Sequence, residues 1–161
     1  MTRKYKSAAA IVLGMHDAIV SLTGLIAGLT FAFADRKIII LSAIIASVAA
    51  GLSMGASCYL AEKTNDNPHA IQAGLTTSVA YMGTCLFLIL PFCIHNDTRV
   101  ALGLSFIVAV AIIFICNLCI RHAHQRSFWR HTIEMLIICL TVSIASFVIG
   151  EFAKCYLGIS V

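Results

Sequence analysis

Five long apolar runs alternate with short polar segments along the chain. The runs cover residues 8–34, 38–61, 70–94, 100–120 and 132–157. A helix that crosses a hydrocarbon core of about 30 Å needs roughly 20 apolar residues, because each residue adds about 1.5 Å. Every run is long enough, so the pattern predicts an all-α fold, a polytopic transmembrane bundle of five helices that forms a single transmembrane domain over residues 1–161.

The polar breaks are too short to hold a further domain. They are Asp35 to Lys37, Glu62 to His69, His95 to Arg99 and Arg121 to His131. Short connections between helices place consecutive helices side by side and antiparallel. The first run resembles a secretory signal peptide in following basic residues, but it is too long for one and is interrupted by His16 and Asp17.

Composition excludes the soluble classes of protein. Of the 161 residues, 60% are hydrophobic and 11% are charged, whereas about 25% are charged in a typical soluble domain. The net charge of +4 does not indicate nucleic-acid binding, because the basic residues lie in short segments between apolar runs. The lipid bilayer is therefore the expected surrounding.

The basic residues predict an orientation. Seven of the eleven lie on the side of the membrane where the chain begins: Arg3, Lys4, Lys6, Lys63, Arg121, Arg126 and Arg130. Since loops rich in Lys and Arg remain in the cytosol, we expect a cytosolic amino terminus. The seven cysteines show no disulfide framework.

Asp17 is the residue that fits lipid least well. It lies about nine residues into the first run, or roughly 14 Å deep, where a carboxylate costs at least about 2.5 kcal/mol. Gly14, Ser21, Gly24 and Gly28 share its helix face. Such a seam of small and polar residues favours either close helix packing or a cation path, and the carboxylate favours the path.

Two sulfur-containing residues on the second run lie near the same depth. Met54 is about seven residues, or roughly 10 Å, from the end of that run, and Cys58 is one turn closer to the end on the same face. A carboxylate together with a thioether suits a borderline divalent metal such as Fe²⁺ better than Mg²⁺ or Ca²⁺. The pattern is consistent with two roles for Met54: packing or lipid contact, which is the more common role of a lone Met, or a metal site shared with Asp17, with Cys58 as an additional soft ligand.

Two further features have weaker meanings. Glu134, near the start of the fifth run, either attracts cations or lies at the membrane interface. The Cys116-x-x-Cys119 spacing imitates a redox or metal motif but falls in an apolar helix without a second cysteine pair. The sequence contains no phosphate-binding glycine loop, zinc-protease pattern or nucleophile–base pairing, so nothing in it indicates an enzyme.

Two motifs resemble a known family. They are Gly14-Met-His-Asp17 with Gly24-Leu-Ile-Ala-Gly28, and Ser53-Met54-Gly-Ala-Ser-Cys58-Tyr59. Their order and separation resemble the vacuolar iron transporter family. The resemblance implies a homodimer that exports Fe²⁺, and often Mn²⁺, from the cytosol in exchange for protons, with Asp17 and Met54 on the metal path. It implies no resident cofactor, and a bacterial cell membrane or a vacuole-type membrane as the location.

Three departures from the family pattern change the expectation. Ala18 replaces a glycine, Cys58 stands where the motif has an acid, and residues 62–69 replace a long cytosolic metal-binding domain. The leading hypothesis is a proton-coupled Fe²⁺ or Mn²⁺ exporter that uses Asp17 and Met54, with Cys58 and Glu134 in auxiliary roles. The alternatives are a transport-inactive scaffold or accessory subunit, and a redox protein that uses its intramembrane thiols.

Overall fold

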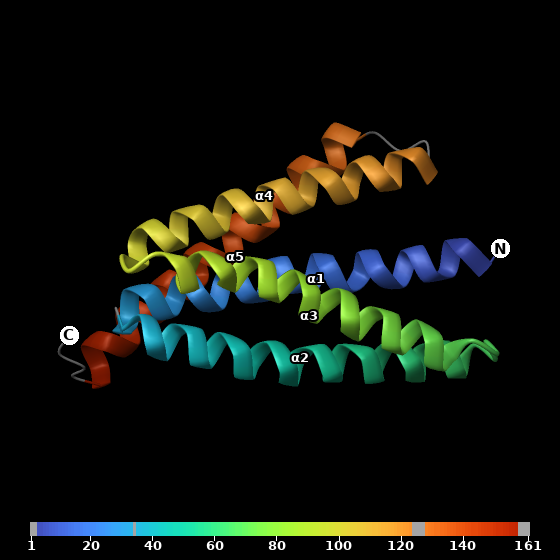
Figure 1. Ribbon diagram of the computed structural model, residues 1–161, viewed down its shortest axis with the longest axis horizontal. Coiled ribbons are helices and arrows are strands. Elements are labelled where there is room, and N and C mark those ends of the chain that lie inside the picture. Colours follow the sequence, from blue (N-terminus) through green and yellow to red (C-terminus); the bar gives the residue numbers. More distant parts are fainter. Residues whose placement is uncertain (1–2, 34, 124–127, 158–161) are drawn as a thin grey trace.

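The computed structural model describes residues 3–33, 35–123 and 128–157, and these form five α-helices without a strand. The helices are α1 (Arg3–Phe33), α2 (Arg36–Thr64), α3 (Ala70–Ile94), α4 (Thr98–Ala123) and α5 (Phe128–Leu157). Figure 1 shows them as long rods that run back and forth along one axis. The predicted all-α bundle of five helices is confirmed.

Four of the five helices extend beyond the predicted runs. Helix α2 begins at Arg36, so the expected turn at Asp35 to Lys37 is mostly helical, and the Asp35 carboxylate accepts a hydrogen bond from the Lys37 backbone N–H at 2.8 Å. An Asp at this N-cap position satisfies one of the free N–H groups of the first turn. The expected basic loop is also shorter, because α4 continues to Ala123 and α5 begins at Phe128. Polar residues mark the end of the apolar span, but the helix itself can continue past them into water.

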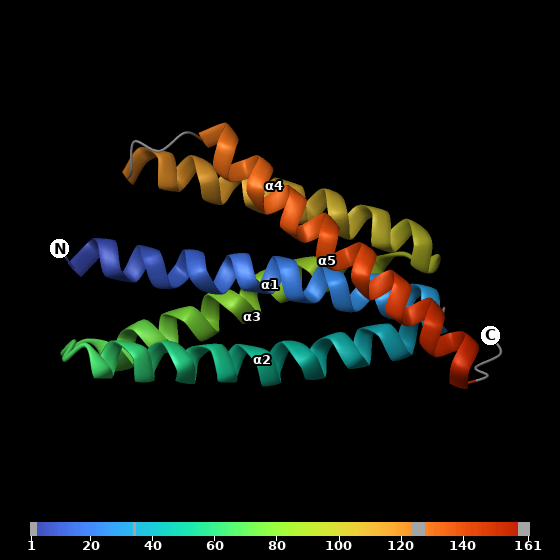
Figure 2. The same cartoon turned by 180° about the vertical axis from the view of Figure 1, so that it is seen from behind.

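Helix α1 is the centre of the bundle. It contacts all four other helices, whereas α2 packs mainly on α3. Helix α4 lies on the other side of α1 from α2, and α5 crosses α1 diagonally (Figures 1 and 2). Ala18, Ile19, Leu22 and Ile26 of α1 are at most 2% exposed. The core therefore surrounds the helix that carries Asp17.

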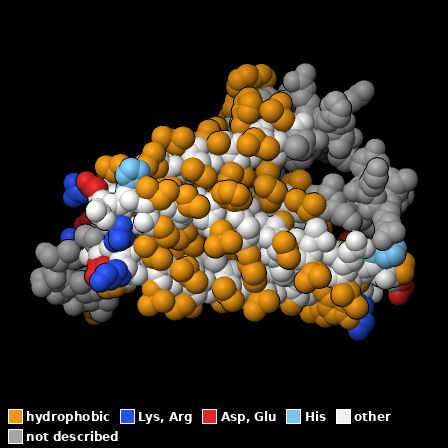
Figure 3. Space-filling view, in the orientation of Figure 1, with side chains coloured by type: hydrophobic (Ala, Val, Ile, Leu, Met, Phe, Trp, Pro, Cys, Tyr) orange, Lys and Arg blue, Asp and Glu red, His pale blue; other side chains and the backbone are white. Residues whose placement is uncertain are grey.

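The outer surface is an apolar belt with charged ends. Apolar side chains cover the middle of the molecule in Figure 3, and charged side chains gather at its two ends. Each of the five helices is long and apolar enough to cross a membrane. Many side chains of α2 and α5 are exposed in the single chain. Exposed apolar surface of this extent is typical of contact with lipid or with another membrane helix.

Candidate functional site

Asp17 lies on the surface of the chain, within the membrane span of α1. It is seven residues from Ala10, where the apolar span begins, which corresponds to a depth of roughly 10 Å. Its side chain is exposed, whereas the next two residues, Ala18 and Ile19, are completely buried. Because an exposed carboxylate at this depth is costly in hydrocarbon, the group requires a covering surface or an aqueous path.

A hydroxyl chain joins the neighbourhood of Asp17 to α3. The Ser21 hydroxyl donates to the Asp17 backbone carbonyl at 2.7 Å and lies 2.7 Å from the Tyr81 hydroxyl. Tyr81 is only 2% exposed. Since the single Ser21 proton is directed at the carbonyl, the Tyr81 hydroxyl donates to Ser21. The Asp17 carboxylate lies within electrostatic range of both the Tyr81 hydroxyl and the Cys85 thiol.

Sequence reasoning missed Tyr81, although a signal for it exists. Thr77, Ser78, Tyr81, Thr84 and Cys85 are all buried on α3. Their spacing of three and four residues places them on one helix face. A stripe of polar side chains inside an uncharged run indicates a buried polar interface between helices. This polar stripe can be read from the sequence, but its contact partner on α1 cannot.

Cys58 points into the junction of three helices. Thr77 of α3 places its hydroxyl 3.2 Å from the Cys58 sulfur of α2, 3.3 Å from the Ala10 carbonyl of α1 and 2.9 Å from the Ala73 carbonyl of its own helix. Cys58 itself is half-buried. The thiol therefore faces the interior of the α1–α2–α3 group and not the lipid.

Glycines allow these three helices to approach closely. A Cβ at Gly14 would lie 2.5 Å from the Thr77 carbonyl oxygen, and a Cβ at Gly74 would lie 2.6 Å from the Gly55 carbonyl oxygen. A Cβ at Gly55 would overlap the Ser78 hydroxyl. Backbone contact of this kind is the usual use of small residues between membrane helices. It fixes the positions of Cys58 and Tyr81 relative to α1.

The predicted seam of α1 therefore serves packing at its two ends. Gly14 contacts α3, and Gly28 contacts α5, where a Cβ at Gly150 would lie 2.6 Å from the Gly28 carbonyl oxygen. Between them, Asp17 is exposed. Packing and a possible cation position thus share one face of α1.

Helix register places Asp17, Met54 and Tyr81 one turn beyond a shared contact layer of α1, α2 and α3. The contact of Gly14 and Cys58 with Thr77 defines a layer that includes all three helices. One turn further from the amino-terminal side are Asp17 on α1, Met54 on antiparallel α2 and Tyr81 on α3. A Cβ at Gly51, three residues from Met54, would lie 3.3 Å from the Tyr81 ring, which agrees with this register.

One chain does not by itself bring the four candidate ligands into one cluster. Met54 is half-buried and packs against the core, and none of the hydrogen bonds of the described residues joins it to Asp17. Across the described residues, no three His, Cys, Asp or Glu side chains are grouped as a metal site. The shared Asp17–Met54 site stays a prediction.

Glu134 lies on the surface, near the start of α5. Its carboxylate is 3.5 Å from the Arg130 Nε, and the two side chains are 56% and 84% exposed. A pair this exposed contributes at most about 1 kcal/mol to stability. Of the possible redox pair, Cys116 donates to the Met15 sulfur at 3.6 Å, whereas the Cys119 side chain lies outside the described residues.

Comparison with known proteins decides the family. The sequence matches the VIT family over residues 8–68 and 62–151, so the match includes both motifs and reaches from α1 into α5. The chain belongs to the VIT family, the vacuolar iron transporters. No curated protein sequence matches it.

Membership and fold together give the general activity. Five candidate spans and the family match make this VIT-family protein an integral, multi-pass membrane protein. The family transports metal ions across membranes and is not a family of enzymes. Asp17, Met54 and Cys58 all fall within the matched residues.

Proposed function

We propose that this VIT-family protein exports Fe²⁺ or Mn²⁺ from the cytosol in exchange for protons, with Asp17 as the site that binds metal and proton in turn. The observation that carries the proposal is the Asp17 carboxylate, which is exposed within the membrane span of α1. A carboxylate that releases a metal ion is free to accept a proton, so one group couples the two fluxes.

The proposal includes a homodimer. An exposed carboxylate within a span needs either a protein surface or water beside it, because lipid cannot satisfy its charge. A second copy placed against the exposed part of α1 supplies that surface and places two Asp17 residues near one path. It also provides additional metal ligands. Among the described residues of one chain, no three His, Cys, Asp or Glu side chains are grouped.

Met54 and Cys58 supply the soft sulfur ligands of the proposed site. Along α2 the Met54 thioether lies one turn beyond the Cys58 thiol, and the thiol faces the helix junction through Thr77. This order suits a metal that enters from the cytosol, meets sulfur first and then reaches the carboxylate. Borderline ions such as Fe²⁺ accept both ligand types. Glu134 at the surface has an auxiliary role as an attractant for cations.

Proton flux in proteoliposomes tests the proposal. Wild-type protein is expected to move protons when Fe²⁺ or Mn²⁺ is added, and Asp17→Asn, which keeps the shape but not the charge, is expected to abolish the response. Glu151→Gln is the matched control, because Glu151 is an exposed carboxylate near the far end of α5. Folding of each variant is checked by its elution profile and melting temperature.

Two outcomes contradict the proposal in different ways. Metal flux without proton flux rejects antiport but keeps transport. No metal flux from folded wild-type protein rejects transport and favours a transport-inactive scaffold or accessory subunit, a role for which the paucity of grouped ligands is the supporting observation.

A further inference from the structure

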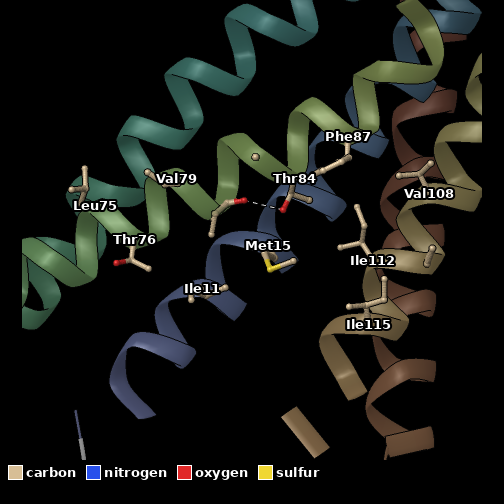
Figure 4. Close-up of a pocket in the computed structure, with 13 residues that line it drawn as sticks. Ile11, Met15, Leu75, Thr76, Val79, Thr84, Phe87, Val108, Ile112 and Ile115 are labelled. Atoms are coloured by element: carbon tan, nitrogen blue, oxygen red, sulfur yellow. Dashed lines mark hydrogen bonds between the residues drawn. The ribbon is translucent and has the colours of Figure 1, made fainter. Parts of the chain in front are cut away.

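A cavity of about 770 Å³ lies between α1, α3 and α4, and its lining includes neither Asp17 nor Met54. Figure 4 shows side chains from the three helices directed at one space, with Met15 of α1 opposite Ile112 and Ile115 of α4. We refer to this space as the α1–α4 groove. Its α3 wall extends from Leu75 to Phe87, which is twelve residues or roughly 18 Å.

The α1–α4 groove offers almost no polar group to a ligand. Its lining contains two hydroxyls, and both are bonded within α3: Thr76 donates to the Gln72 carbonyl at 2.6 Å, and Thr84 donates to the Ala80 carbonyl at 2.8 Å. The rest of the lining is apolar apart from backbone. A metal ion or a polar solute would lose its hydration here without replacement, so the occupant is a hydrocarbon.

The position of the groove matches one leaflet of a bilayer. Ile11 and Ile115 line it and lie only one and three residues from the amino-side ends of their spans. The α3 wall extends over roughly 18 Å, slightly more than half of a hydrocarbon core of about 30 Å. The groove therefore opens at the depth where an acyl chain leaves its headgroup.

The sequence is basic at the amino-side ends of α1 and α4, which favours an anionic headgroup. Helix α1 begins with Arg3, Lys4 and Lys6, and α4 carries Arg121 in its last turn. Neither residues 1–16 nor residues 100–133 contain an acidic residue. Basic residues at the ends of membrane helices attract anionic phospholipids.

The groove is bounded by α1, α3 and α4 of one chain, so a lipid chain can fill it without a second copy. We propose that the α1–α4 groove binds one acyl chain of an anionic phospholipid, whose headgroup lies at the basic ends of α1 and α4. This inference does not depend on the transported ion or on the direction of transport.

Gly83 provides a direct test. It lines the groove, and a Cβ added to it would meet no atom within 4 Å. Gly83→Leu therefore fills the groove without a clash. Gly103→Leu is the matched control, because Gly103 of α4 has equally open space around it but does not line the groove. Ala111→Phe, from the α4 wall, is a second filling variant.

The experiment combines native mass spectrometry with melting temperatures after addition of phosphatidylglycerol or phosphatidylcholine. Wild type and Gly103→Leu are expected to retain one phosphatidylglycerol per chain. They should prefer it to phosphatidylcholine by about fivefold or more, because one basic residue beside an anionic headgroup contributes about 1 kcal/mol. They are also expected to melt at a higher temperature with phosphatidylglycerol. Gly83→Leu and Ala111→Phe are expected to lose both effects.

Three results would overturn the proposal. Equal retention of the two lipids by wild type rejects an anionic ligand, and this arm needs no variant. Full retention of phosphatidylglycerol by a folded filling variant rejects the groove as its site. Separation of a dimer into single chains by Gly83→Leu, with lipid retention unchanged, shows that a second copy occupies the groove.

Discussion

The hydroxyl of Tyr81 lies 2.7 Å from that of Ser21, and this contact links α3 to α1 one turn beyond Asp17. It connects an almost completely buried phenol to the serine that holds the Asp17 backbone carbonyl. The helix face that presents the carboxylate is therefore fixed by a side chain on another helix. Rotation of α1 about its axis would break this contact.

Removal of the Tyr81 hydroxyl is expected to destabilise the bundle modestly. Tyr81→Phe leaves the ring in place and removes one hydrogen bond, which contributes about 1 kcal/mol in a typical case. A double-mutant cycle with Ser21→Ala, read from melting curves in detergent, measures the contact itself. Tyr156→Phe is the control, because that side chain is 82% exposed. Strictly additive effects of the two substitutions would show that the hydroxyls do not interact.

Addition of a methyl group between α2 and α3 is expected to be more damaging. A Cβ at Gly55 would overlap the Ser78 hydroxyl and lie 2.8 Å from the Gly74 carbonyl oxygen. Overpacking of a tight interface costs about 1–3 kcal/mol, so Gly55→Ala should lower the melting temperature by several degrees. Gly103→Ala, with open space around it, should be neutral or slightly stabilising.

The Gly55 prediction has an internal check. Ser78→Ala removes the hydroxyl but leaves the Gly74 carbonyl, so the pair Gly55→Ala with Ser78→Ala should recover only part of the lost stability. A Gly55→Ala protein as stable as wild type would contradict the close approach of α2 and α3.

Replacement of Cys58 is expected to change metal preference. Cys58→Ser replaces a soft metal ligand with a hard one. The serine still provides a hydrogen-bond acceptor for the Thr77 hydroxyl. Because Fe²⁺ gains more from soft ligands than Mn²⁺ does, the ratio of Fe²⁺ to Mn²⁺ transport should fall severalfold in proteoliposomes. Cys93→Ser, at an exposed thiol near the far end of α3, is the matched control. An unchanged ratio in Cys58→Ser would remove Cys58 from the metal path.

Part of the candidate site was predictable because an ionisable residue in an apolar run is conspicuous. Asp17 needed only the hydropathy pattern, and Met54 and Cys58 needed helix spacing and the motif. Tyr81 and Thr77 were not predicted, because uncharged hydroxyls are common in membrane helices and their importance depends on partners. Those partners, Ser21 and Cys58, are 60 and 19 residues away in sequence.

The sequence by itself determined the number of helices, their type and their antiparallel succession, since hydrocarbon admits only segments that satisfy their own backbone hydrogen bonds. Tertiary structure decided that α1 lies at the centre, that α3 holds it through Thr77 and Tyr81, and that Asp17 faces outward. The reason is that apolar side chains gain little from one another in lipid, so close glycine contacts and hydroxyl pairs select the helix faces that meet. These contacts form between helices distant in sequence, and no local pattern encodes them.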